Sequence, residues 1–150
     1  MKRVSLMILA AGACMLQAQT NPVITEQKNA YTRLKGNVIK AAEKMPEDAY
    51  SFKPTPEMQS FGERKPNPAQ GKTSKADIVA ALKASYDACD AAWDSMNDKT
   101  AMEMVAGRGG TQNSKLSVLI GNNMHIQEMY GYISPYMRLK GVVPPTSDRN

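Results

Sequence analysis

The candidate metal-binding or catalytic side chains of this chain are grouped around His125, its single histidine. Asn122 stands three residues before it and Met129 four residues after it, so on a helix all three side chains project from one face. Imidazole is a common metal ligand, but a zinc site normally needs three protein ligands of nitrogen, sulfur or oxygen type. Spacing alone therefore favours a packed, hydrogen-bonded imidazole over a ligand.

Two other patterns offer weaker chemistry. Residues 107–110 (GRGG) are rich in glycine, but they lack the Gly-Lys-Ser/Thr ending of a phosphate-binding loop and no strand precedes them, so a flexible connector is expected. A Cu(I) site on Met124, His125 and Met129 would use soft thioether sulfur. Met124, however, points about 100° away from the other two around a helix, and methionines at this spacing usually fill cores.

Three segments of the chain carry the apolar period of an α-helix and must position these residues. They run from about Ile24 to Met45, from about Lys75 to Met96, and from near Ser114 to near Lys140. No β alternation is visible, and the long connections between the segments are rich in Pro, Gly and polar residues. The sequence therefore predicts an all-α, up-down helical bundle.

The ends of these helices carry recognisable signals. Ser74 and Asp77 fit a capping box at the second start, and Pro46 ends the first helix. Gly141 is a fitting stop residue for the third helix. Pro135 falls inside that helix, where the lost backbone hydrogen bond predicts a bend.

The second helix carries an apolar stripe in which Tyr86 and Trp93 supply most of the area to be buried. The stripe consists of Ile78, Leu82, Tyr86 (or Ser85), Cys89, Trp93 and Met96. Cys89 is the only cysteine downstream of residue 18, so no disulfide can form within that part of the chain. The thiol either packs in the core, which is its usual place, or pairs with a second copy of the chain.

The first residues follow the order of a secretory signal peptide. Lys2 and Arg3 give a basic start, an apolar run extends from Val4 to Leu16, and the small residue Ala18 precedes Gln19. We expect a signal peptide at 1–18, a single domain at 19–150, and a periplasmic or extracellular protein without a membrane span. A lipid anchor on Cys14 is the less favoured alternative, since it lacks the usual aliphatic residue three places before it.

Charge argues against nucleic acid as a partner. Cleavage after Ala18 removes two of the 19 basic side chains, so 17 stand against 14 acidic ones, a formal charge of +3. The basic residues are interleaved with acids rather than gathered on one face. A solvated surface is the expected role for most of them.

Four stretches of the chain resemble the DinB-like superfamily. Residues 122–131 (NNMHIQEMYG) and 136–145 (YMRLKGVVPP) resemble its last helix and tail. Residues 45–54 (MPEDAYSFKP) resemble the exit from its first helix, and residues 60–63 (SFGE) resemble the start of its second. The resemblance as a whole extends over nearly all of the chain that follows the signal peptide.

The resemblance implies a four-helix bundle, often dimeric, that holds a divalent metal such as zinc, nickel or manganese with three histidines. One histidine lies on the second helix and two lie four residues apart on the last, and some members are transferases that use low-molecular-weight thiols. His125 matches the first histidine of the last helix, but Met129 stands in the place of its partner. A thioether is a poor ligand for these metals.

The chain departs further from the superfamily after Glu63. It passes directly into Arg64-Lys65-Pro66-Asn67-Pro68, so the second helix and its histidine are missing, and three main helices are expected. A bundle without one helix leaves an apolar groove, which a second copy or a helix from another protein could fill.

Two classes of function follow from the resemblance and its defects. The favoured one is a non-catalytic or partner-binding protein with a degenerate metal site. The alternative is a metal-dependent enzyme of the thiol S-transferase type with a minimal site at His125, completed by Glu128 or by the second subunit of a dimer. The sequence names no catalytic residue, substrate or thiol donor.

Overall fold

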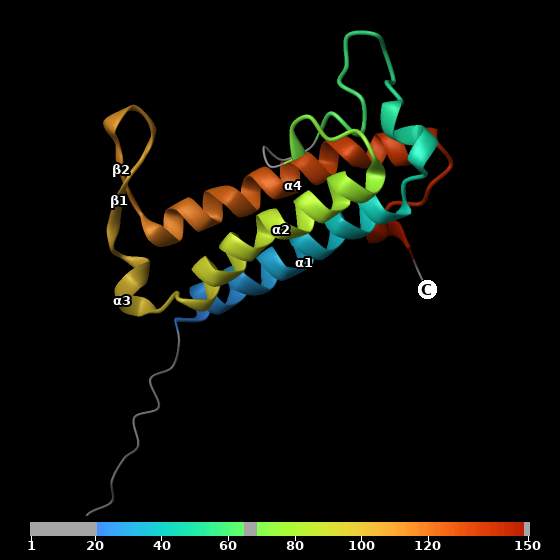
Figure 1. The fold of residues 1–150 in the computed structure, drawn as a ribbon. Coiled ribbons are helices and arrows are strands. Elements are labelled where there is room, and N and C mark those ends of the chain that lie inside the picture. Colours follow the sequence, from blue (N-terminus) through green and yellow to red (C-terminus); the bar gives the residue numbers. More distant parts are fainter. Residues whose placement is uncertain (1–20, 65–68, 149–150) are drawn as a thin grey trace, which may run out of the picture.

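The protein is an all-α helical bundle in the computed structural model, which describes residues 21–64 and 69–148 (Figure 1). Its long helices are α1 (Pro22–Lys44), α2 (Lys75–Asp94) and α4 (Lys115–Leu139). Along the chain α1 and α4 run in one direction and α2 runs in the opposite one. The all-α class and the three main helices expected from the sequence are confirmed.

Side-chain caps fix where these helices begin. Asn21 accepts a hydrogen bond from the Val23 backbone N–H, Ser74 accepts one from Asp77, and Ser114 accepts one from Ser117. Such caps satisfy N–H groups that have no partner within the helix. The helix bounds predicted from periodicity and caps differ from the observed ones by two residues or fewer.

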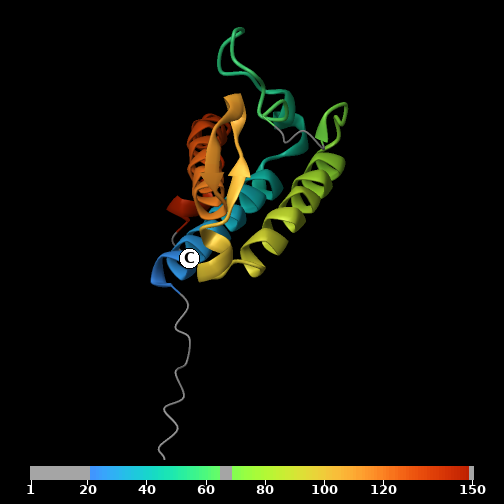
Figure 2. The same cartoon turned by 90° about the vertical axis from the view of Figure 1, so that its left-hand side faces the viewer.

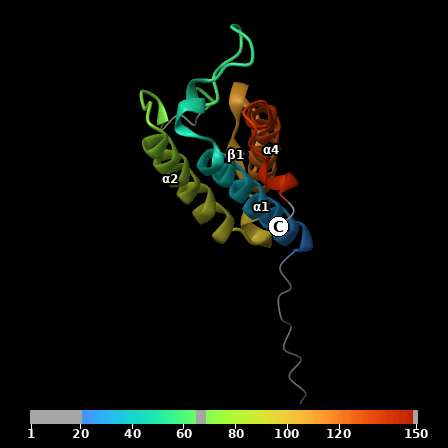
Figure 3. The same ribbon diagram turned by 90° about the vertical axis from the view of Figure 1, so that its right-hand side faces the viewer.

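Helix α1 lies between the other two long helices and packs against both (Figure 3). On the side facing α2, the Tyr31 ring stands 6.2 Å from the Tyr86 ring and 6.0 Å from the Trp93 ring, measured between centroids. On the side facing the end of α4, Met45 and Met137 are fully buried. Residues from all three long helices contribute to each of the two buried apolar clusters of the core.

The connection between α2 and α4 differs from the polar, flexible segment expected. It contains a short helix, α3 (Asp98–Ala101), and a hairpin in which β1 (Met104–Ala106) pairs antiparallel with β2 (Gln112–Ser114). Figures 1 and 2 show this hairpin at the end of the bundle where α4 begins. Gly109 and Gly110 adopt φ values of 66° and 78°, which glycine tolerates best, so these residues form the hairpin turn. Strands of three residues are too short to show alternation in the sequence.

Residues 60–63, which resemble the start of a second helix, form the hydrogen bonds of a helix N-terminus. Glu63 Oε2 accepts a 2.6 Å hydrogen bond from the Ser60 backbone N–H, and Ser60 Oγ accepts one of 3.2 Å from the Glu63 backbone N–H. This is the reciprocal pattern of a capping box. Between Phe52 and Ser74, however, the described residues form turns and bends and no α-helix.

Two expectations concern the ends and the membrane. The signal peptide expected at 1–18, with Cys14 as alternative lipid site, lies outside the described residues. Within the described ranges, no helix combines the length and apolar character needed to cross a bilayer.

Candidate functional site

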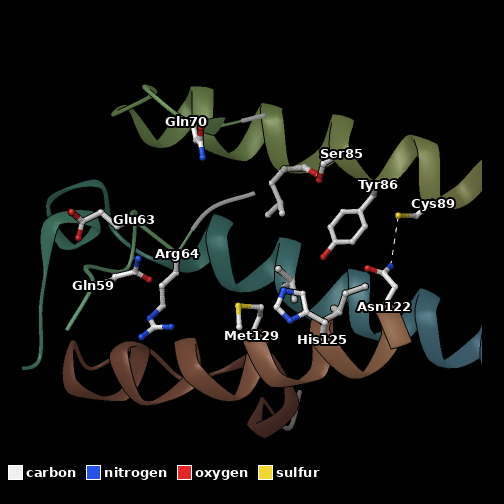
Figure 4. A pocket seen from close by; sticks show the side chains of 13 residues that line it. Gln59, Glu63, Arg64, Gln70, Ser85, Tyr86, Cys89, Asn122, His125 and Met129 are labelled. Carbon is white, nitrogen blue, oxygen red and sulfur yellow. Dashed lines mark hydrogen bonds between the residues drawn. The ribbon is translucent and has the colours of Figure 1, made fainter. Parts of the chain in front are cut away.

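A groove lies between the facing sides of α2 and α4 (Figure 4). Its volume is about 570 Å³. We call it the α2–α4 groove. Its lining residues come from α1 (Val38), α2 (Leu82, Ser85, Tyr86 and Cys89), α4 (Asn122, His125, Ile126 and Met129) and the loop before α2 (Gln59, Glu63, Arg64 and Gln70).

The three side chains singled out by helical spacing line this groove together. Asn122, His125 and Met129 all come from the groove side of α4, and Figure 4 shows His125 and Met129 side by side. The imidazole is not packed in the core as spacing alone favours, because its side chain is 64% exposed. Its Nδ1 atom lies 3.4 Å from Glu128 Oε2, a weak contact at the exposed edge of the helix.

The potential metal ligands near His125 are few. Glu128 accepts a 2.7 Å hydrogen bond from the Tyr132 hydroxyl, and this bond, with a smaller contribution from His125, holds the pKa of the Glu128 carboxyl below its usual value. Across residues 21–64 and 69–148, no three His, Cys, Asp or Glu side chains stand close enough to hold one metal ion. The described residues therefore do not fit the three-ligand site that the resemblance implies.

The Cu(I) alternative also loses a ligand. Met124 is 69% exposed and does not line the groove, whereas His125 and Met129 do. The three residues are therefore not brought together, as the 100° separation around the helix indicates. His125 and Met129 remain as an adjacent pair.

Cys89 occupies the wall of the groove formed by α2. The thiol is free and only half-buried, and its Sγ atom accepts a 3.7 Å hydrogen bond from Asn122 Nδ2 across the groove. It is thus a groove-lining thiol rather than the fully buried core thiol favoured from the sequence. Next to it, burial raises the pKa of Tyr86 to about 12, with a smaller effect from the neighbouring thiol.

Arg64 closes one end of the groove and was missed by the sequence reasoning. The central carbon of its guanidinium lies 5.0 Å from the Tyr132 ring centroid and 5.4 Å from that of Tyr136. Its Nε atom donates a 3.2 Å hydrogen bond to the Tyr136 hydroxyl, which in turn donates one of 2.9 Å to the Gln59 carbonyl oxygen. The four-residue spacing of the tyrosines, one turn after Met129, was the available signal for a cation-binding aromatic face.

The acid beside Arg64 has other partners. Glu63 is bound by the Ser60 backbone N–H and pairs with Lys53 Nζ at 3.3 Å. The Ser60 bond and, to a smaller extent, Lys53 lower the pKa of Glu63, so this carboxylate is ionised and engaged. Figure 4 shows its side chain turned away from the centre of the groove, whereas the Arg64 side chain extends toward α4 at the same end.

Two comparisons with known proteins, one with protein-family models and one with curated proteins, find no relative of this chain. No protein-family model matches it, and no curated protein matches it significantly. Membership of the DinB-like superfamily therefore stays a prediction carried by the motifs quoted above. The function has to be inferred from the groove itself.

Proposed function

We propose that this chain is an exported, DinB-like helical bundle that acts as a non-catalytic binding protein, with the α2–α4 groove as its binding site. The observation that carries the proposal is an open groove of about 570 Å³ between α2 and α4. Ligand sites in proteins have volumes of roughly 300 to 1,000 Å³ and combine an apolar lining with a few polar groups. The groove has both properties.

The ligand chemistry around His125 supports a non-catalytic role. A catalytic zinc site uses three protein ligands and keeps one position open for water. The groove offers one imidazole, a thioether at Met129, and a carboxylate at Glu128 that already binds Tyr132. Thioether sulfur binds zinc, nickel and manganese poorly, so a divalent ion would have at most two good ligands.

A metal-dependent enzyme of the thiol S-transferase type is the second candidate. It is favoured by the proximity of His125 Nδ1 and Glu128 Oε2, 3.4 Å apart at the exposed edge of the groove, where a second subunit could add further ligands. In this case the protein would be a homodimer, and metal would promote its assembly. A helix donated by a second copy or by another protein is the corresponding alternative occupant of the groove.

Calorimetric titration of the signal-free protein with zinc, nickel and manganese tests the proposal. His125→Ala removes the one imidazole, and Met129→His restores the second histidine at the position four residues along the same helix face. We expect the wild type and His125→Ala to show no binding tighter than about 0.1 mM, and Met129→His to bind measurably. Micromolar binding by the wild type, about 8 kcal/mol, that disappears in His125→Ala would support the enzyme instead.

Export and assembly have separate tests. Expression of the full chain in a host with a secretory pathway should release a protein whose mass corresponds to a first residue of Gln19. Cytoplasmic retention of the intact chain would contradict export. Sedimentation of the secreted protein should give a monomer if a small ligand occupies the groove, whereas a stable dimer would favour the second copy as occupant.

A further inference from the structure

We propose that the α2–α4 groove binds a small monocarboxylate with an apolar body, whose carboxylate pairs with Arg64 while its body lies between α2 and α4. The inference rests on the proposed function, because it names the ligand of the same groove. It depends on Arg64, on the balance of charge in the groove and on the apolar side chains beyond it.

Arg64 is held in place before any ligand arrives. Two tyrosine rings flank its guanidinium at 5.0 and 5.4 Å, and Nε is bound by the Tyr136 hydroxyl. Within the described parts of the chain, its two Nη atoms have neither a hydrogen-bond acceptor nor an acidic partner. A guanidinium fixed in this way presents planar N–H donors that match a carboxylate and loses little side-chain freedom on binding.

The charges lining the groove leave one positive group to be neutralised. Glu63 is paired with Lys53, and His125, at the exposed edge, is bonded to Glu128. Among the described residues that line the groove, Arg64 is therefore the one positive side chain without an acidic partner, and it lies next to an ionised Glu63. A monocarboxylate balances this charge, whereas a phosphate monoester carries about −1.5 to −2 at neutral pH and would leave an excess beside Glu63.

The rest of the groove is suited to an apolar body. Val38 forms its floor on α1, and Leu82 and Ile126 contribute from α2 and α4. Met129 lies between Arg64 and His125 in Figure 4, at the point where the head group of a ligand would meet its chain. A flexible thioether side chain adapts to ligands of different shape, which suits a simple aliphatic or aromatic body.

Isothermal titration calorimetry with octanoate, octanol and octyl phosphate separates the contribution of the head group to the binding affinity from that of the alkyl chain. We expect octanoate to bind the wild type, octanol to bind at least tenfold more weakly, and octyl phosphate to bind more weakly than octanoate. Arg64→Gln should lower octanoate affinity at least tenfold and leave octanol unchanged. Arg138→Gln, at an arginine that binds Ser147 outside the groove, is the matched control and should leave both affinities unchanged.

Arg64→Lys, examined by circular dichroism, tests whether a loss of affinity in the Arg64 variants comes from a folding defect. The lysine variant keeps the charge but loses the planar fork, so it should bind octanoate with intermediate affinity while retaining the wild-type helical spectrum. Equal affinity of the wild type for octanoate and octanol, unchanged in Arg64→Gln, would overturn the carboxylate inference and leave the groove as a binding site. Binding of none of the three probes would also overturn it, while the metal titration decides between binding protein and enzyme independently.

Discussion

Tyr136→Phe tests whether the hydroxyl that holds Arg64 also stabilises the fold. Tyr136 is 1% exposed, and its hydroxyl donates a 2.9 Å hydrogen bond to the Gln59 carbonyl oxygen and accepts one from Arg64. A buried hydrogen bond contributes about 1 kcal/mol, and one to a charged group somewhat more. Phenylalanine keeps the ring beneath the guanidinium and removes only the hydroxyl. We therefore expect Tyr136→Phe to lower the free energy of unfolding by about 2 kcal/mol and the melting temperature by roughly 7 °C.

Tyr132→Phe is the matched control on the same helix. Its ring also faces Arg64, but its hydroxyl binds the exposed Glu128 carboxylate. Thermal unfolding followed by circular dichroism should show no change for Tyr132→Phe, and octanoate affinity should fall only in Tyr136→Phe. Equal melting temperatures for the two variants would refute the claim that the Tyr136 hydroxyl anchors the loop carrying Arg64.

Three further predictions concern stability and the thiol. Asp90→Asn removes the carboxylate that pairs with Lys35 at 2.5 Å. The hydrogen bond from Lys35 is the largest cause that lowers the pKa of Asp90, so the stabilisation is present above about pH 4 and is lost as the pH falls through the depressed pKa. Because the ion pair is partly exposed, Asp90→Asn should lower the free energy of unfolding, measured with denaturant, by no more than about 1 kcal/mol at pH 7. The decrease should be smaller near pH 2.5, and an equal decrease at both pH values would contradict this prediction. Gly62→Ala places a Cβ 3.0 Å from a backbone carbonyl oxygen and should destabilise by about 1 kcal/mol, whereas Gly36→Ala, with open space in α1, should stabilise by a similar amount. Iodoacetamide should modify Cys89 in the folded protein, and octanoate should slow the reaction; mass spectrometry that finds no adduct before unfolding would contradict a groove-lining thiol.

The long helices could be predicted because their signals are local. Apolar residues at steps of three and four define α1, α2 and α4, and capping residues such as Ser74 and Ser114 mark two starts within one residue. The hairpin between α2 and α4 could not be predicted. Its strands are three residues long, and its turn depends on the backbone conformation of Gly109 and Gly110 rather than on an apolar pattern.

The candidate site was predicted in part. Helical spacing correctly places Asn122, His125 and Met129 on one face, but exposure depends on what packs opposite that face, which is a tertiary property. The same limit explains Cys89, whose apolar spacing indicates a core position although the thiol lies in the wall of the groove and is only half-buried. The position of Arg64 could not be predicted because this residue lies in a loop. The sequence of a loop has no periodicity that indicates which helix a side chain will contact.

A methyl NMR titration of protein labelled at the methionine methyl groups distinguishes a ligand-binding groove from a metal centre. Met129 lines the groove, whereas Met124, on the same helix, is 69% exposed and lies outside it. We expect octanoate to shift the Met129 signal and leave that of Met124 unchanged, and zinc at equal concentration to move neither. The binding groove would be contradicted, and a metal centre supported, if octanoate left the Met129 signal unchanged while zinc shifted it, and if zinc caused no shift in His125→Ala.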